Sequence, residues 1–240
     1  FALAYVNKAV EILSSIKETE SALADCYNLL GAIYHHRQDF KKGLDYFSLA
    51  EEIFKHTSEK DLLANVYVNI SYLELDNGDY NKANEYARKA LELFKEVNDG
   101  KGIATAYINL QVANYNANEN PKSQNYKNEL QNCITLLDSA VNSIKDIRSP
   151  EHLITIYQNK TELYEYLGNI DSSYAYLQKY LVLKDSLYEI SKQKQIQELR
   201  IQYEANKKEK DNEVLAAQNK SKSYFIIIII TGAALAVTIL

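Results

Sequence analysis

The 240-residue sequence contains no methionine and no tryptophan, and only two cysteines and two prolines. Cys26 and Cys133 are too far apart for a Cys-x-x-Cys motif, and we expect buried free thiols there rather than a disulfide between them. The scarcity of proline leaves long stretches without a helix breaker. Because the chain opens on Phe1 within a helical pattern, we expect a fragment or processed product, in which a signal peptide would not be visible.

The sequence also lacks the motifs of common catalytic, metal and cofactor sites. It contains no His-Glu-x-x-His pair and no glycine-rich phosphate loop. Only His35 and His36 are adjacent among the four histidines, and we expect solvated side chains there, since a metal site needs further ligands. A net charge of −5 gives no support for nucleic-acid binding. We therefore expect no catalytic residue, no metal, no cofactor and no nucleic-acid partner within these residues.

What the sequence does contain is a repeat of 40 residues. Tyr27, Tyr67 and Tyr107 are spaced at this interval, and alanines recur at the same interval around them. These alanines are Ala24, Ala64 and Ala104, followed by Ala50 and Ala90. A fixed period of 20–50 residues indicates a stack of supersecondary units, none of which can bury its apolar face alone. Such stacks usually present binding surfaces.

Each period contains two amphipathic segments separated by a tight break. Residues 24–34 carry apolar side chains at steps of three and four, which predicts a helix buried on one face. A second helix is predicted over 42–54 and again over 82–94. The break reads Gln38-Asp39-Phe40, then Asn77-Gly78-Asp79-Tyr80, then Gly168-Asn169-Ile170. Glycine and asparagine can end one helix, and aspartate can cap the next.

These features resemble the tetratricopeptide repeat family. The matching residues are the early aromatics Tyr27, Tyr67, Tyr107 and Tyr157, the group Leu30-Gly31-x-x-Tyr34, the turn Gly78-Asp79-Tyr80-x-x-Ala83, and the late Ala50 and Ala90. The departures are Gly43 in place of alanine, Glu74 in place of tyrosine, and Gln111 and Thr161 in place of glycine. The resemblance implies an all-α solenoid of helical hairpins over 1–183. After a partial first repeat, the repeats would lie near 22–58, 62–98, 102–146 and 152–183.

The third repeat is longer than the others. Ala140 falls 50 residues after Ala90, so about ten residues are inserted, and the polar segment 114–121 is the expected place. Insertions in solenoids map to loops on one face. The inserted loop is either a tolerated surface loop, which we favour, or a contact for a ligand.

The resemblance also implies a ligand-binding groove lined by the first helix of each repeat. An asparagine two residues after the repeated tyrosine can hydrogen-bond a peptide backbone, and nearby side chains would supply further contacts. The candidate groove residues are Asn69, Tyr72, Asn109, Tyr115, Asn159, Glu162 and Tyr166. The alternative is that the asparagines only stabilise helix packing. Asn69 and Asn159 also fit the glycosylation pattern, which we discount because both are predicted inside helices.

Residues 184–222 have a different character, with no glycine or proline and many Lys, Glu and Gln. They predict one long helix of about 60 Å. Its interrupted apolar stripe is compatible with a weak coiled coil, and thus a homodimer, or with a solvated spacer.

The following segment, 223–240, is strongly apolar, and Tyr224 to Leu240 carry no charge. We expect a transmembrane helix cut before its end, because a span needs about 20 residues and nothing downstream could cover a buried core helix. Lys220 and Lys222 just before it favour a cytoplasmic flank, although the other flank is not in the sequence.

Helical repeats, a long helix and a span together resemble the sensor region of bacterial single-pass signalling proteins. That resemblance implies periplasmic repeats at the inner membrane, a protein or peptide ligand in the groove, and an output domain after Leu240, either a histidine kinase or a helix-turn-helix module. The alternative is a passive membrane-anchored scaffold for protein complexes. An enzyme within these residues is the least favoured reading, because no acid–base or metal constellation converges.

Overall fold

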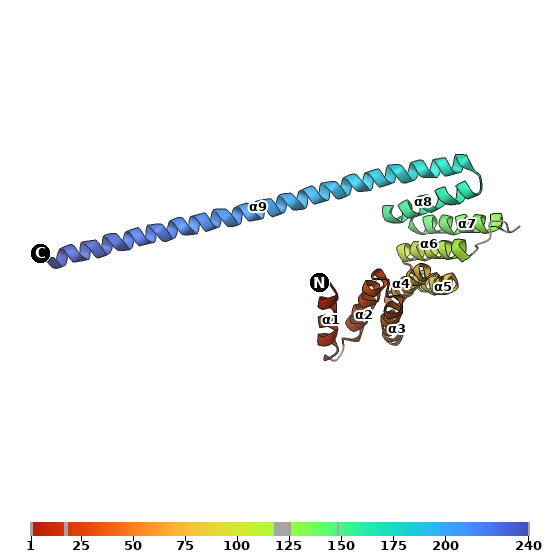
Figure 1. Cartoon of the computed structure of the whole chain (residues 1–240), viewed down its shortest axis with the longest axis horizontal. Helices are drawn as coiled ribbons and strands as arrows, with labels where there is room; N and C mark the ends of the chain where they lie inside the picture. The colour runs from red at the N-terminus through yellow and green to blue at the C-terminus, as the bar shows by residue number, and fades with distance from the viewer. Residues whose placement is uncertain (1, 17–18, 118–125, 148, 240) are drawn as a thin grey trace. The chain divides into compact units, whose positions relative to one another are not determined.

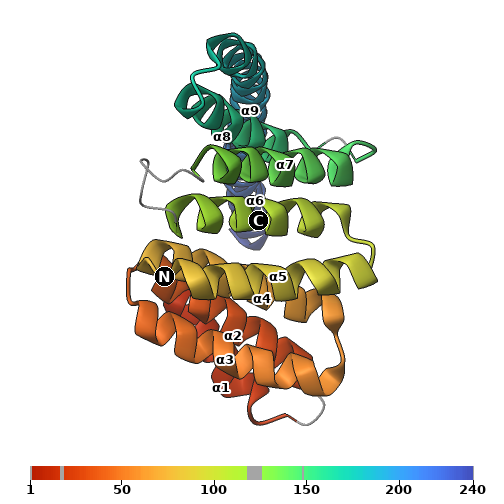
Figure 2. The same cartoon turned by 90° about the vertical axis from the view of Figure 1, so that its right-hand side faces the viewer.

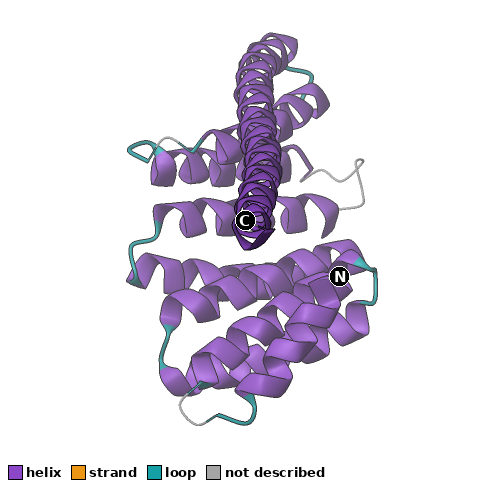
Figure 3. Ribbon diagram, turned by 90° about the vertical axis from the view of Figure 1, so that its left-hand side faces the viewer, coloured by secondary structure: helices purple, strands orange, loops and turns teal. Residues whose placement is uncertain are grey.

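The computed structural model describes the backbone of residues 2–16, 19–117, 126–147 and 149–239, and their side chains except those of 217, 221, 222 and 224–239. Within these ranges the chain is helical with short connections (Figure 3). The helices are α1 (Ala2–Leu13), α2 (Glu20–His36), α3 (Phe40–Thr57), α4 (Lys60–Asn77), α5 (Tyr80–Glu96), α6 (Gly100–Ala117), α7 (Tyr126–Ile144), α8 (Pro150–Tyr166) and α9 (Ile170–Ile239) (Figure 1). The all-α class is as expected. The chain divides into two compact units, Phe1–Lys184 and Asp185–Leu240.

In the first unit, α2 packs on α3, α4 on α5 and α6 on α7, as successive helical hairpins stacked in chain order (Figure 2). The first helices also contact one another, α2 with α4, α4 with α6 and α6 with α8. Among the described residues, α3, α5 and α7 make no such mutual contacts. The first helices therefore lie on the inner side of a curved stack, which is the face that the resemblance to tetratricopeptide repeats implied as the groove.

The core of this unit consists of two clusters of buried side chains. One lies among α2 to α6 and contains Phe47, Phe54 and Phe94, and the other lies among α6 to α8 around Leu137 and Ile156. Full burial of a side chain of this size contributes about 1.5–3 kcal/mol to stability. Because each cluster takes its side chains from more than one hairpin, each hairpin depends on its neighbours for stability.

The repeated tyrosines pack between the two helices of their own hairpin. Three pairs, each separated by 19 residues in sequence, bring ring centroids close together: Tyr27 and Tyr46 at 6.2 Å, Tyr67 and Tyr86 at 5.7 Å, and Tyr157 and Tyr176 at 5.9 Å. In the third repeat Tyr107 instead lies beneath the Lys95 ammonium, at 5.6 Å. The hydroxyl-bearing rings thus fill the space between helices.

The breaks between helices fall where the sequence predicted them. Gln38, Gly78 and Gly168 have positive φ values of 62°, 82° and 73° and end the first helices of their hairpins. The next residue in each case donates its N–H to the carbonyl five positions earlier, for example Asp79 to Glu74 at 2.9 Å. This left-handed turn satisfies helix-end carbonyls, and the aspartate or asparagine that follows is free to cap the next helix.

The Asp79 cap allows a direct test. Its side chain accepts a hydrogen bond from the Lys82 N–H at 3.1 Å, and hydrogen bonds from the Lys82 side chain and backbone lower the pKa of its carboxyl. We expect Asp79→Ala to lower the free energy of unfolding by about 1 kcal/mol in urea denaturation at neutral pH. Because the folded-state pKa lies below the usual 3.8, the difference should persist above that value and vanish as the pH falls through the folded-state pKa. Asp79→Ser, an uncharged cap, should retain most of the stability without this pH dependence.

Small residues permit close approach between helices. A Cβ atom on Gly31 would lie 2.5 Å from the Phe47 ring, and one on Gly102 would lie 2.3 Å from the Phe94 ring. In the second repeat Ser71 donates its hydroxyl to the Ala83 carbonyl at 2.8 Å, and Ser173 donates likewise to Thr161 at 3.1 Å. These bonds join the two helices of a hairpin at positions 12 residues apart.

The third repeat extends over a longer stretch of chain, as predicted. The equivalent contact there, from the Cys133 thiol to the Gln111 carbonyl at 3.8 Å, joins residues 22 apart, ten more than in the other repeats. Helices α4 and α6 have the same length. The ten additional residues therefore lie between Ala117, the last residue of α6, and Cys133 on α7. Of the predicted insertion at 114–121, residues 114–117 are helical and belong to α6, so the loop expected there was wrong, and residues 118–121 lie outside the described part of the chain.

Helix α9 is longer than expected, because it continues without a break from the fourth repeat through 184–222 and on to Ile239, 70 residues in all. Nothing in its sequence before Gly232 would interrupt it. Across the described residues, no helix has a stretch both long and apolar enough to cross a membrane. The span predicted at 223–240 falls, apart from Ser223, on residues whose side chains are not described.

Both cysteines are free thiols, as expected. Cys133 is buried, and burial followed by the charge of Glu129 raises the pKa of its thiol to about 11. Cys26 is only half-buried, so the expectation of two fully buried thiols was wrong for this residue.

Candidate functional site

The candidate groove residues come together on the inner face of the first helices, around two hollows. Asn69, Tyr72 and Asn109 line one hollow, and Tyr115, Asn159 and Glu162 line the other. Tyr166, the seventh candidate, lies beside Tyr115 with ring centroids 5.8 Å apart. Because α6 contributes to both hollows, they are neighbours along one face of the solenoid.

The hollow between α6 and α8 has a volume of about 270 Å³. Its floor includes the apolar Val112 and Leu163, and its walls carry amides and the Glu162 carboxylate. Tyr115 shares a hydrogen bond with Tyr166, and partial burial together with that bond raises the pKa of the Tyr115 hydroxyl. The hydroxyl therefore stays protonated at neutral pH and can serve as a hydrogen-bond donor.

The hollow among α4, α6 and α8 has a volume of about 400 Å³ and includes Val68 and Ile108. His152 lies at its edge, 2.7 Å from the Ser149 hydroxyl through Nδ1 and 2.9 Å from the Thr105 hydroxyl through Nε2. Burial lowers the pKa of His152 despite the adjacent Glu151 carboxylate. The imidazole is thus neutral at pH 7 and links α6 to α8.

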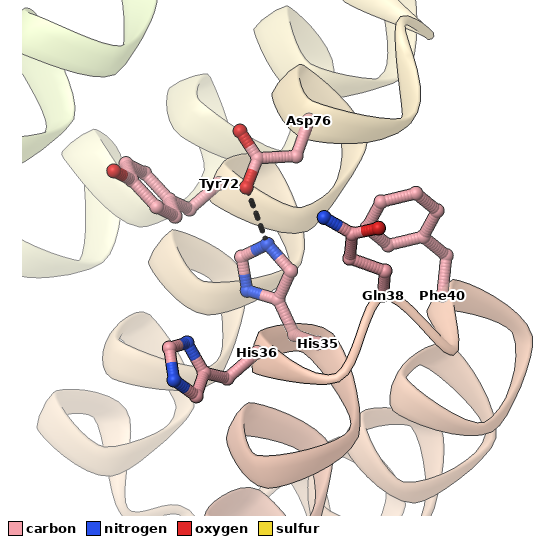
Figure 4. Close-up of a pocket in the computed structure, with 6 residues that line it drawn as sticks. All are labelled: His35, His36, Gln38, Phe40, Tyr72 and Asp76. Atoms are coloured by element: carbon pink, nitrogen blue, oxygen red, sulfur yellow. Dashed lines mark hydrogen bonds and ion pairs between the residues drawn. The ribbon is translucent and has the colours of Figure 1, made fainter.

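A third hollow, of about 660 Å³, lies between α2 and α4 and shares Tyr72 with the second (Figure 4). Figure 4 shows the His35 ring and the Asp76 carboxylate pointing toward each other, with His35 Nε2 2.8 Å from Asp76 Oδ2. The expectation of solvated histidines was therefore wrong for His35, whose side chain is 14% exposed, and holds for the exposed His36. Among the described residues, no cluster of three or more His, Cys, Asp or Glu could hold a metal ion.

The three asparagines donate their amide groups to the neighbouring repeat. Asn69 Nδ2 donates to Asn28 Oδ1 at 2.9 Å, and Asn159 Nδ2 donates to Gln111 Oε1 at 2.7 Å. Asn109 is 3% exposed, and its Nδ2 lies 3.4 Å from the Ser71 hydroxyl. These bonds join first helices across repeats, which is the packing role weighed in the sequence. Asn69 and Asn159 also line a hollow.

Two buried charged residues near this face were missed by the sequence pattern. Lys160 on α8 is 2% exposed, donates to Asp138 on α7, and lies 3.3 Å from the Tyr176 hydroxyl on α9. Burial disfavours its charge, but the hydrogen bond to Asp138 and the contact with Tyr176 outweigh this and raise its pKa. Glu74 is 1% exposed and accepts from Asn77 at 3.0 Å. The repeat position could have flagged Lys160, because the equivalent Leu30, Ile70 and Leu110 are all buried. The residues equivalent to Glu74 (Tyr34, Asn114 and Tyr164) are only half-buried, so its burial could not be predicted in the same way.

Comparison with known proteins identifies part of this architecture. Residues 64–96, which span most of α4 and α5, match the family model described as tetratricopeptide repeat. This confirms the predicted repeat type for that hairpin. No curated protein sequence matches the chain.

Several solved structures share the fold. BtubC (BKLC) from P. vanneervenii aligns with a TM-score of 0.65 and 17% identity, covering 78% of this chain and 73% of its own. Aspartyl phosphate phosphatase F from Bacillus subtilis aligns with a TM-score of 0.66 and 18% identity, covering 79% of this chain and 47% of its own. The apo form of RapI aligns with a TM-score of 0.59 and 18% identity, covering 78% and 65%. At such identities the likeness is one of fold.

Proposed function

We propose that this chain is the protein- or peptide-binding sensor region of a membrane-anchored bacterial signalling protein. The ligand would occupy the groove along α4, α6 and α8. The observation that carries the proposal is the packing around α8, which lines the groove with Asn159 and Glu162 and supports α9 with Tyr157 and Tyr164. A ligand on α8 therefore touches the helix against which the start of α9 is packed.

Signalling requires that the ligand bind two packings of the fourth repeat with different affinity. The Tyr164 and Tyr176 rings stack with centroids 5.5 Å apart and planes 6° apart, and the Ser173 hydroxyl bonds to α8. A change in the tilt of α8 would disturb these contacts and move the start of α9. In this proposal the displacement is passed along α9, which is a single helix from Ile170 to Ile239.

The membrane part of the proposal rests on the uncharged segment 224–240. In this proposal 223–240 spans the inner membrane, the repeats lie in the periplasm, and 184–222 pairs with a second copy. A histidine kinase or helix-turn-helix module would follow Leu240. No enzymatic activity is proposed for the repeats themselves.

A passive membrane-anchored scaffold is the alternative, and it uses the same groove without a change in α9. The two differ in what ligand binding does to residues beyond the fourth repeat. A nitroxide spin label on residue 203 would report a change in spacing or mobility on ligand binding for the sensor, and none for the scaffold.

Membrane topology is the first test. We expect alkaline phosphatase, active only in the periplasm, to be active when fused after Gln218 and inactive when fused beyond Leu240. Green fluorescent protein fluoresces when it folds in the cytoplasm and not when it is exported unfolded to the periplasm. It should therefore be dark when fused after Gln218 and fluorescent when fused beyond Leu240. The reverse pattern would refute the ectodomain proposal and leave a membrane-tethered cytoplasmic scaffold. Activity of both phosphatase fusions would refute the span.

A further inference from the structure

The charges of the groove point to the chemistry of its ligand. The three hollows contain the carboxylates of Asp76, Glu151 and Glu162, and none of their lining residues is a lysine or arginine. Asp76 is already paired with His35, whereas Glu151 and Glu162 have no basic side chain among the ion pairs of the described residues. The two hollows beside α8 are therefore lined by carboxylates and by no lysine or arginine, and the Lys101 ammonium lies near His152, whose pKa is lowered by burial and then by this charge.

The spacing of the Glu151 and Glu162 carboxylates indicates how far apart two cationic groups of a ligand would lie. Glu151 and Glu162 are 11 residues apart on α8, about three turns, so both project from the same side of the helix. At 1.5 Å per residue they lie about 16 Å apart along the axis. An extended peptide rises about 3.3 Å per residue, so the same distance covers about five of its residues.

Between the carboxylates the face is suited to an apolar side chain with a polar backbone. Ile108 lines the hollow that contains Glu151, and Val112 lines the hollow that contains Glu162. The amides of Gln158 and Asn159, which lie between the two glutamates in sequence, line the second of these hollows. Side-chain amides at this place can bond to a peptide backbone, while the apolar floor receives one side chain. The order along the groove is thus carboxylate, apolar floor, carboxylate.

We infer that the groove between α6 and α8 takes an extended cationic peptide segment, with two Lys or Arg side chains about five residues apart and an apolar residue between them. This rests on the proposed function and names its ligand class. Glu151 and Glu162 neutralise the two cations, and the like-charged rim disfavours acidic peptides.

The inference is tested by isothermal titration calorimetry of the full chain in detergent micelles with three short peptides. The first is Lys-Ala-Leu-Ala-Ala-Lys with blocked ends, and the others carry Gln or Glu in place of both Lys. We expect the lysine peptide to bind at least about tenfold more tightly than the glutamine peptide, with no detectable binding of the glutamate peptide. Raising the salt concentration should weaken only the lysine peptide.

Matched variants assign the effect to the two carboxylates. Glu151→Gln together with Glu162→Gln should weaken binding of the lysine peptide about tenfold and leave the glutamine peptide unchanged. Glu92→Gln, an identical charge change at an exposed position on α5, should alter neither. Circular dichroism checks that each variant remains folded.

Other outcomes separate this inference from the proposed function. Equal binding of lysine and glutamine peptides would overturn the charge assignment and keep the groove as a peptide site. An unchanged lysine affinity in the double variant would move the cation site elsewhere and overturn the inference. Failure of all three peptides to bind would overturn it as well, while the topology test of the sensor proposal stands independently.

Discussion

Phe94→Ala is expected to lower the free energy of unfolding by about 3–5 kcal/mol, a large part of the stability of a chain of this size. Phe94 is 1% exposed and sits at the end of α5, where its ring covers the backbone of Gly102 on α6. Removing the ring leaves a cavity between the second and third repeats, because Gly102 has no side chain with which to fill it. Urea denaturation followed by far-ultraviolet circular dichroism measures the loss.

Two further variants guard against simple failure to fold. Phe94→Leu should lower the free energy of unfolding by less than half as much as Phe94→Ala, and Leu49→Ala on the exposed side of α3 should lower it by well under 1 kcal/mol.

Gly102→Ala should destabilise the wild-type chain by about 1–3 kcal/mol but less in the Phe94→Leu background, where the added methyl group has room. Additive losses for that pair would contradict the proposed contact.

Asp138→Ala should destabilise the protein and Lys160→Met should not, although each removes one member of the same ion pair. Among the described residues, Asp138→Ala leaves the buried Lys160 ammonium with the Tyr176 hydroxyl as its hydrogen-bond partner, and we expect the free energy of unfolding to fall by about 1–3 kcal/mol. This is below the range for a fully buried pair because Asp138 itself is 58% exposed. Lys160→Met replaces the ammonium by an apolar group of similar length, as at the equivalent Leu30, Ile70 and Leu110, and should leave stability unchanged or raise it by about 1–2 kcal/mol.

The pH dependence provides a second readout. The folded-state pKa of Lys160 lies above its ordinary value of 10.5, so the pair contributes full stability below that pH and loses it as the pH rises through the folded-state pKa. Urea midpoints of wild type and Lys160→Met should therefore differ by a constant amount at neutral pH and change relative to each other only in strongly alkaline solution. A loss in Lys160→Met as large as that in Asp138→Ala would show that the lysine stem, rather than its charge, matters.

The hairpins were predictable because their signals are local and repeated. The spacing of Tyr27, Tyr67 and Tyr107 and the turn at Gly78 and Asp79 each follow from the needs of one helix end or one helix interface. The insertion in the third repeat was visible as a change of register. These features require no knowledge of what lies across the stack.

The features that could not be predicted from the sequence are contacts between side chains on different helices. Asn159 lines the groove as expected, but the bond from its amide to Gln111, 48 positions earlier, could not be predicted from the repeat pattern. A lysine is rarely buried unless it is paired with an opposite charge. The partner of Lys160, Asp138, lies on the preceding helix, so the sequence around Lys160 gives no sign of the pair. His35 was likewise misread, since Asp76 belongs to the next repeat.

The reach of these inter-repeat bonds has a consequence for how the first unit folds. Bonds such as that from Asn69 to Asn28 connect positions 41 apart, and in the described part of the chain each first helix contacts its own repeat and the repeats beside it. Every native contact can thus form as soon as two consecutive hairpins exist, so folding can nucleate at any adjacent pair and spread in both directions. Amide hydrogen exchange should accordingly fall in steps from repeat to repeat, with the slowest exchange in α4 and α5.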